Sequence, residues 1–452
     1  MLSRLDDPRM RERVDDLKDI DLRVQRVLAG EDPRQAIELP DQAVVLAENL
    51  LPSQLLEMDR KHLAGICLAG GGVTSHVAIL AISMNVPMLV AAGRDVLAIK
   101  AGADLLLDAE VGEMHVSPQV EAAERFAARI SEEKRHGELV AGAARQPCFT
   151  RDDVHIHIHA NIASAADAKS AVECGAEGCG LLRTEFLFMD RLHAPDAEEQ
   201  LRAYRAVSTE LGDRPLVVRT LDAGGDKPIA YIQQAHEENP ALGVRGVRLS
   251  LAHRGLLQTQ LQALLQLDHP QPVRVMIPMV SSADEVEEVR GLMATLGAGP
   301  SDGRLKLGIM VETPAAAMIS DRLAEMVDFF SIGTNDLTQY TLCMDRGEPA
   351  LARNFDTLHP GVLRLIAQTA NAADRAGIPV AVCGAAAGDP LAAPLLLGLG
   401  IRELSMPAGL VARQKAHLRK ISMVECEELA STALELGSAR AVRGLVREFL
   451  VV

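Results

Sequence analysis

Four arginine residues in the part of the chain after residue 148 lie in motifs where they could bind an anion. Arg183 in GLLRTEFLF and Arg219 in VVRTLDAGGDK stand at the ends of apolar runs, and Arg245 lies in NPALGVRGVR and Arg346 in MDRGEP. A single arginine after a strand is most often a surface ion-pair partner. Several arginines on one rim favour a multiply charged anion, because the planar guanidinium binds phosphate or carboxylate through two hydrogen bonds and keeps its proton.

Two carboxylates stand at the ends of neighbouring apolar runs in the same part of the chain. Glu312 lies in MVETPAA, and Asp336 follows Asn335 in GTNDLTQY. Two hard oxygen ligands there would hold one Mg²⁺ that keeps waters and takes substrate oxygens. Asp336 could instead cap the helix after it. A cation site beside arginines suits phosphoryl transfer, because the transition state of that reaction requires positioning and charge neutralisation.

A cysteine and a histidine could take part in chemistry directly. Cys383 in VAVCGAAAGDP is either an ordinary buried cysteine or a thiol that gives a proton to an enolate as it forms. In GGGVTSHVAILA the glycines before His76 allow close approach, and Thr74 or Ser75 can cap the helix that follows. The start of that helix would stabilise a phosphate attached to the imidazole. The run HIHIHA at 155–160 is interpreted as strand alternation rather than as a metal site.

The elements that must position these residues follow from the apolar runs after residue 148. Eight strand-like runs alternate with helical stretches: VHIHIHA, GCGLLRT, PLVVRT, VRVMIPMV, LKLGIMVE, VDFFSIGT, IPVAVCG and IRELSM. This α/β alternation predicts a (β/α)₈ barrel, while an open doubly wound sheet remains an alternative. The polar residues favour the barrel, because they lie where strands should end at their carboxyl side, which is where such barrels build active sites.

The chain before residue 148 divides into three predicted parts. Within 1–30, apolar residues at spacings of three and four predict one amphipathic helix over 8–30. A compact α/β domain over 31–118 contains the β-like runs QAVVLA, GICLAG, MLVAAG, ADLLLDA and EMHVSP. The charged, Ala-rich stretch 119–147 predicts a linker helix. The predicted barrel then occupies 148–452.

Composition argues against several classes of protein. The 452 residues include no Trp and three Tyr and carry a net charge of −16, which argues against a nucleic-acid-binding protein. The seven cysteines form no CxxC pair, so neither a disulfide framework nor a zinc ribbon is expected, and the cytoplasm is the expected compartment. Neither a secretory signal nor an uninterrupted apolar stretch of about 18 residues is evident, so no membrane insertion is expected.

These motifs resemble those of enzyme I of the bacterial phosphotransferase system, the phosphoenolpyruvate-protein phosphotransferases. The resemblance covers essentially the whole chain in the family's order: GGGVTSHVAILA, GLLRTEFLFMDR, RTLDAGGDK, NPALGVRGVR, MVETPAAAM, SIGTNDLTQYT, DRGEP and CGAAAGD. It implies a smaller swivelling phosphohistidine domain joined by the linker helix to a phosphoenolpyruvate-binding barrel.

The resemblance also implies roles for individual residues. His76 would be the phosphorylated nucleophile, and Cys383 would protonate the enolate to give pyruvate. Glu312 and Asp336 would ligate Mg²⁺. The residues that bind phosphoenolpyruvate would be Arg183, Arg219, Asn335 and Arg346, with Arg245 and Asp336 in the same substrate site.

Family members pass the phosphoryl group to the carrier protein HPr and dimerise through the barrel. HPr and a second copy of the chain are therefore the expected partners.

The sequence departs from the family pattern in three places. Residues 1–30 match only the last helix of the HPr-docking subdomain, which predicts an N-terminally truncated form. Ile82 stands where the family has Arg, and Ala385 replaces the Glu of CGELAGD. The motif CGAAAGD resembles that of the fructose-type proteins in which enzyme I is fused to other phosphotransfer modules.

The sequence is also compatible with two other functions. A non-catalytic phosphoenolpyruvate sensor or regulator would account for Ile82, Ala385 and the missing docking region. A relative of phosphoenolpyruvate synthase or pyruvate phosphate dikinase would share the histidine domain and the barrel. Those enzymes also need an ATP-grasp nucleotide domain, for which 452 residues leave no room.

Overall fold

The structure is a computed structural model in which the chain forms two compact units, Met1–Lys134 and Arg135–Val452. It describes Gln25 and residues 38–451 except for the short segments 72–75, 85, 110–111, 190, 225–228, 230, 233–236, 299–302, 347, 349–350 and 352–353. The helix predicted over 8–30 therefore lies outside the described residues, apart from Gln25.

The first unit combines a parallel sheet with a β-hairpin. Strands β1 (Ala43–Ala47), β2 (Leu63–Leu68) and β3 (Met88–Leu89) form the sheet, and β4 (Leu105–Asp108) and β5 (Glu113–Val116) form the antiparallel hairpin. Helices α2 (Pro52–Glu57) and α3 (His76–Ser83) and the 3₁₀ helix η2 (Arg94–Ala98) lie between strands. The five β-like runs predicted in this region are thus all strands.

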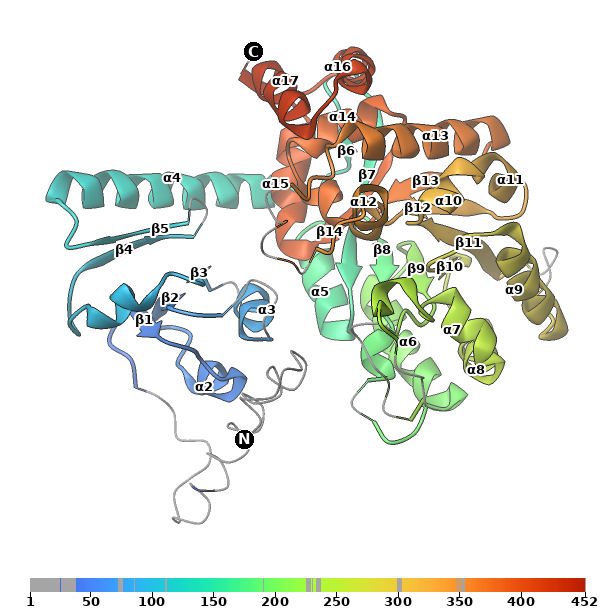
Figure 1. The fold of residues 1–452 in the computed structure, drawn as a ribbon, viewed down its shortest axis with the longest axis horizontal. Helices are drawn as coiled ribbons and strands as arrows, with labels where there is room; N and C mark the ends of the chain where they lie inside the picture. The colour runs from blue at the N-terminus through green and yellow to red at the C-terminus, as the bar shows by residue number, and fades with distance from the viewer. Residues whose placement is uncertain are drawn as a thin grey trace. The chain divides into compact units, whose positions relative to one another are not determined.

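Helix α4 (Val120–Ala144), labelled in Figure 1, lies where the linker helix was predicted. The division between the two units falls inside this helix. Asp108, at the end of β4, is buried and forms an ion pair with Arg129 of α4. The guanidinium of Arg129 also lies 5.0 Å from the ring centroid of Phe126. These contacts attach the first part of the helix to the hairpin.

The second unit is a closed barrel of eight parallel strands, as predicted (Figure 1). The strands are β7 (His155–Ile162), β8 (Cys179–Leu182), β9 (Leu216–Arg219), β10 (Val273–Ile277), β11 (Leu305–Val311), β12 (Phe329–Ile332), β13 (Val380–Val382) and β14 (Glu403–Pro407). Strand β14 pairs with β7 and closes the barrel, which excludes the open sheet. The short strand β6 (Cys148–Phe149) pairs with β7 in the antiparallel direction.

Helices surround this barrel and begin at residues that suit helix starts. The longer ones are α5 (Ala165–Glu173), α6 (Ala197–Leu211), α8 (Arg254–Leu265), α9 (Ala283–Thr295), α12 (Thr334–Leu342), α13 (Pro360–Ala376), α15 (Ala408–Leu418), α16 (Met423–Glu435) and α17 (Ala439–Val451). The shorter ones are α7 (Val247–Ala252), α10 (Pro314–Met318), α11 (Ser320–Ala324) and α14 (Ala392–Gly398). Side chains of Ser164, Asp196 and Ser282 accept hydrogen bonds from the first turns of α5, α6 and α9.

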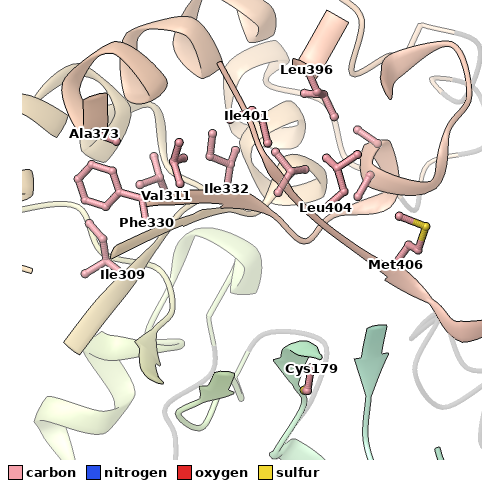
Figure 2. Packing of buried hydrophobic residues seen from close by; sticks show 14 of the residues in the cluster. Cys179, Ile309, Val311, Phe330, Ile332, Ala373, Leu396, Ile401, Leu404 and Met406 are labelled. Atoms are coloured by element: carbon pink, nitrogen blue, oxygen red, sulfur yellow. The ribbon is translucent and has the colours of Figure 1, made fainter. Parts of the chain in front are cut away.

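Alternation along the strands separates two layers of side chains. In β7, Ile156 and Ile158 belong to the large apolar cluster between strands and helices, part of which is shown in Figure 2. Side chains at the intervening positions of the barrel strands face its interior, where a smaller cluster consists of Leu181, Val217, Met276, Met310, Phe329 and Cys383. None of the described helices combines the length and the apolar character that a membrane span requires.

Close helix packing on the outside of the barrel depends on one glycine. Gly398 ends α14, and a Cβ atom added there would overlap the backbone carbonyl of Cys426 in α16. A backbone group cannot move aside as a flexible side chain can. The contact between α14 and α16 therefore requires glycine at position 398.

Replacing Gly398 by Ala should lower the free energy of unfolding of the barrel by about 1–3 kcal/mol, because overpacking forces the two helices apart. Thermal unfolding followed by circular dichroism measures the change. Gly444→Ala in α17 is the matched control, since a Cβ atom there meets nothing within 4 Å. An equal effect of both substitutions would contradict the packing argument.

Candidate active site

Eight of the nine residues singled out from the sequence lie at the carboxyl ends of the barrel strands, here called the carboxyl rim. Arg219 is the last residue of β9, and Arg183, Glu312 and Cys383 directly follow β8, β11 and β13. The others are Asn335 and Asp336 in the first turn of α12, Arg245 in the segment before α7, and Arg346 after α12. Parallel strands end on one side, which is why positions far apart in the sequence meet here.

A chain of ion pairs connects the buried charges of the rim. Arg219 contacts Glu185 and Asp222, both at 3.0 Å. Arg245 contacts the same Asp222 at 3.2 Å and Asp336 at 3.1 Å. Burial alone would lower the pKa of each of these arginines, but the surrounding carboxylates more than offset it and the net shift is upward. Both guanidiniums are therefore charged and held in place.

Glu312 is enclosed by the same cluster. Its Oε1 accepts a hydrogen bond of 2.7 Å from the amide of Met279, and a Cβ atom on Gly333 would lie 2.7 Å from its Oε2. Burial raises the pKa of Glu312 well above its usual range, and the carboxylates of Asp336 and Asp222 add to the shift. The Glu312 carboxyl would thus be stabilised by an additional positive charge.

The donor groups buried at the rim suit a divalent cation. Among the described residues, the buried charged groups there are two guanidiniums, of Arg219 and Arg245, and four carboxyl groups, of Glu185, Asp222, Glu312 and Asp336. A hard dication prefers oxygen ligands of this kind. Glu312 and Asp336 lie on neighbouring strand ends and interact electrostatically, so they could contribute one oxygen each.

Two further arginines of the rim are exposed to solvent. Among the described residues, the guanidinium of Arg183 has no hydrogen-bond partner, and it lies within electrostatic range of Arg219 and Arg346. Arg346 donates a hydrogen bond of 3.4 Å to Asp336 and has a side chain that is 37% exposed. Cations gathered in this way favour an anion that enters from solvent and bridges them.

Cys383 is buried in the interior of the barrel, within electrostatic range of Arg183 and Arg219. Its Sγ lies 3.7 Å from the carbonyl oxygen of Ile332, and burial raises the pKa of its thiol to about 11. The side-chain amide of Asn161 donates to the carbonyl of Cys383 at 3.1 Å, and Ser405 donates to Asn161 at 2.7 Å. At neutral pH the thiol is thus protonated and its backbone is fixed, which suits a proton donor rather than a nucleophile.

Asn335 is held by the segment that follows β13. Its side-chain oxygen accepts a hydrogen bond of 2.9 Å from the backbone amide of Ala385. The side chain of Ala385 is exposed, so it takes no part in this contact. The hydrogen bond therefore does not depend on which side chain stands at position 385.

His76 belongs to the first unit, where it begins α3. Residues 72–75 before it lie outside the described residues, so the predicted capping by Thr74 or Ser75 stays a prediction. Val77 and Ala78, which follow His76 in the helix, are buried. The start of α3 is thus anchored in the core of the first unit.

Three residues of the site were not predicted from the sequence: Glu185, Asp222 and Tyr340. Glu185 stands two residues after Arg183, and Asp222 three residues after Arg219, in motifs that were singled out for their arginines. The hydroxyl of Tyr340 lies 3.3 Å from the Arg245 guanidinium. A buried arginine requires negatively charged partners. The acidic residues close to Arg183 and Arg219 in the sequence could therefore have indicated these ion pairs.

The raised pKa of Cys383 predicts how its alkylation by iodoacetamide depends on pH. Only the thiolate reacts, so the rate at Cys383 should rise about tenfold per pH unit from pH 7 to 9.5 without levelling off. Mass spectrometry of the peptide that contains Cys383 measures the rate. Alkylation of the exposed Cys343 in the same sample shows that the reagent is active. A rate that is already constant between pH 7 and 9 would show that the thiolate is stabilised.

Comparisons with known proteins identify relatives of both units. The family model "PEP-utilising enzyme, mobile domain" matches residues 39–112, and "PEP-utilising enzyme, PEP-binding domain" matches residues 138–423. The multiphosphoryl transfer protein of Rhodobacter capsulatus is 41% identical over 98% of this chain and 54% of its own length. The chain thus spans about half the length of this relative.

Two shorter relatives match over most of their length. The phosphoenolpyruvate-protein phosphotransferase of Geobacillus stearothermophilus is 37% identical, covering 99% of this chain and 78% of the relative. That of Haemophilus influenzae is 38% identical, covering 100% of this chain and 80% of the relative. The chain therefore belongs to the family of PEP-utilising enzymes that includes the phosphoenolpyruvate-protein phosphotransferases and the multiphosphoryl transfer proteins.

Proposed function

We propose that the protein transfers the phosphoryl group of phosphoenolpyruvate to His76, releases pyruvate and passes the phosphoryl group on to the carrier protein HPr. The observation that carries this proposal is the carboxyl rim. It combines exposed arginines, buried carboxyl groups and a protonated thiol on one side of the barrel. The family relationship supports the same reaction.

In this proposal the rim binds the anion through both kinds of arginine. Arg183 and Arg346, which are exposed, contact the phosphate and carboxylate groups as the substrate enters. Arg219 and Asn335 lie deeper and complete the contacts. Arg245 and Asp336 belong to the same substrate site, where their ion pair of 3.1 Å keeps Asp336 in place. A phosphorylated trianion would be neutralised by such a set with little rearrangement.

Mg²⁺ fits the donor set of the rim, with Glu312 and Asp336 as its protein ligands. Bound there, the ion would neutralise charge on the substrate oxygens and would balance the buried carboxylates. The hydrogen bond from Met279 to Oε1 of Glu312 fixes the orientation of that carboxylate. Oriented carboxylates are what a small cation with strict geometry requires.

The reaction divides between the two units of the chain. An imidazole nitrogen of His76 attacks the phosphorus, and the bond between phosphorus and the enol oxygen breaks with its electrons left on oxygen. The resulting enolate takes a proton at its methylene carbon from the thiol of Cys383, which gives pyruvate. The thiolate then regains a proton from water, assisted by its high pKa of about 11.

We propose HPr, free or fused to a longer chain, as the acceptor from His76, a homodimer through the barrel, and a cytoplasmic location. The names of the multiphosphoryl transfer relatives support phosphotransfer partners. Titration with purified HPr and the mass of the native protein in solution test the first two points.

Incubation with labelled phosphoenolpyruvate and Mg²⁺ should place an acid-labile, base-stable phosphate on His76, because phosphohistidine has this stability. Peptide mapping locates the label. His76→Ala should abolish labelling, whereas His115→Ala, a change at an exposed histidine of the same unit, should leave it unchanged. Chelation of Mg²⁺ should also abolish it. Tight binding of phosphoenolpyruvate without labelling or pyruvate release would instead support a sensor.

Replacing Cys383 by Ser should slow pyruvate formation by a factor on the order of 100 or more while leaving the Kd of phosphoenolpyruvate nearly unchanged, because a hydroxyl is a weaker acid than a thiol. Rapid-quench measurement of pyruvate together with calorimetric titration separates the two effects. Cys343→Ser changes an exposed thiol and serves as the control. Unchanged turnover in Cys383→Ser would remove the proton-donor role.

A further inference from the structure

The amino ends of the barrel strands carry a cluster of histidines that the proposed reaction does not use. His155 and His157 occupy alternate positions of β7, so their side chains lie on the same face of the strand. Their ring centroids are 4.1 Å apart. The alternation that predicted a strand in HIHIHA is therefore also what brings two imidazoles together.

A carboxylate from another part of the chain faces both rings. Oε2 of Glu177, a residue just before β8, lies 2.8 Å from Nε2 of His155 and 3.8 Å from Nδ1 of His157. One possible ligand atom from each of the three residues falls within 4.8 Å of the other two. Tetrahedral sites with ligand bonds of about 2.0–2.2 Å place their ligand atoms roughly 3.4 Å apart. The three atoms thus need only small shifts to share one ion.

The residues around the cluster hold it in this arrangement. The second oxygen of Glu177 lies 2.8 Å from Nζ of Lys415, which is fully buried. Lys415 is itself fixed by the carbonyl groups of Ala144 and Gln146, at 3.0 and 3.1 Å. On the other side, the ring of Phe149 stacks on that of His155 with centroids 4.8 Å apart. Such outer contacts orient metal ligands and reduce the entropy lost on binding.

We propose that His155, His157 and Glu177 form a binding site for a divalent transition-metal ion of the zinc type. Two imidazoles and one carboxylate are a ligand set that suits Zn²⁺ and its neighbours and not Mg²⁺, which prefers oxygen ligands. The side chain of His157 is half-exposed, so water can reach the site and would supply a fourth ligand. When the ion binds, the proton at Nε2 of His155 moves to Nδ1 or to solvent, since the ligand is an imidazole lone pair.

This site is separate from the proposed Mg²⁺ site. Asn161, which contacts the carbonyl of Cys383, lies at the other end of β7 from His155. Six residues of extended strand cover roughly 20 Å. The two ends of the same strand would therefore serve two ions of different chemistry, and binding of one can be measured while the other site is saturated.

The test uses the full chain without an affinity tag, equilibrated with Zn²⁺ in a buffer that contains excess Mg²⁺. After gel filtration, elemental analysis should find about one Zn²⁺ per chain. The His155→Gln/His157→Gln variant should retain almost none. His115→Gln is the matched control, because it removes a histidine paired with a single carboxylate, Glu113, at 3.3 Å. Its zinc content should equal that of the wild type.

Circular dichroism and thermal unfolding in EDTA establish that each variant is folded. Should the double variant fail to fold, His157→Gln alone provides the test, with an expected loss of tenfold or more in Zn²⁺ affinity by calorimetry. Wild-type protein that takes up no stoichiometric Zn²⁺ would overturn the proposal. So would a folded variant at His155 and His157 that binds Zn²⁺ as tightly as the wild type.

Discussion

Buried guanidinium groups at the carboxyl rim require negative partners, and the rest of the site is arranged around this requirement. Arg219 and Arg245 share the carboxylate of Asp222, and Arg245 also engages Asp336. Removing one partner from such a pair would leave a buried charge uncompensated, at a cost of about 3–5 kcal/mol. Within the described part of the chain Glu312 forms no ion pair, and burial raises the pKa of its carboxyl group. A cation bound beside it would favour the ionised form.

The arginines of the rim have two different roles. The buried arginines fix the positions of carboxylates, whereas Arg183 and Arg346 are exposed to solvent. A site of this kind is ordered before its ligand arrives, so little reorganisation energy is required when charge develops during a reaction. Cys383 lies inside the barrel, where burial keeps the thiol protonated.

Much of the barrel and of its rim could be predicted from the sequence, because both depend on local patterns. Apolar runs revealed the eight strands, and Glu312 and Cys383 were found simply because they follow such runs. The ion-pair partners were not predicted, since the pairing of Arg245 with Asp336 joins residues 91 positions apart. The contact between Glu177 and His155 was not predicted either, because it depends on how β7 and β8 are placed in the folded barrel.

Closure of the barrel has a consequence for how the chain acquires its structure. The last barrel strand pairs with the first, with Pro407 beside Asn161. On a ribosome that adds about 5–20 residues per second, the first strand would wait roughly 10 to 50 s for this neighbour. During that interval its edge would be unpaired and prone to non-native association. Nascent chains should therefore be most in need of chaperones until the last barrel strand, β14, has been made.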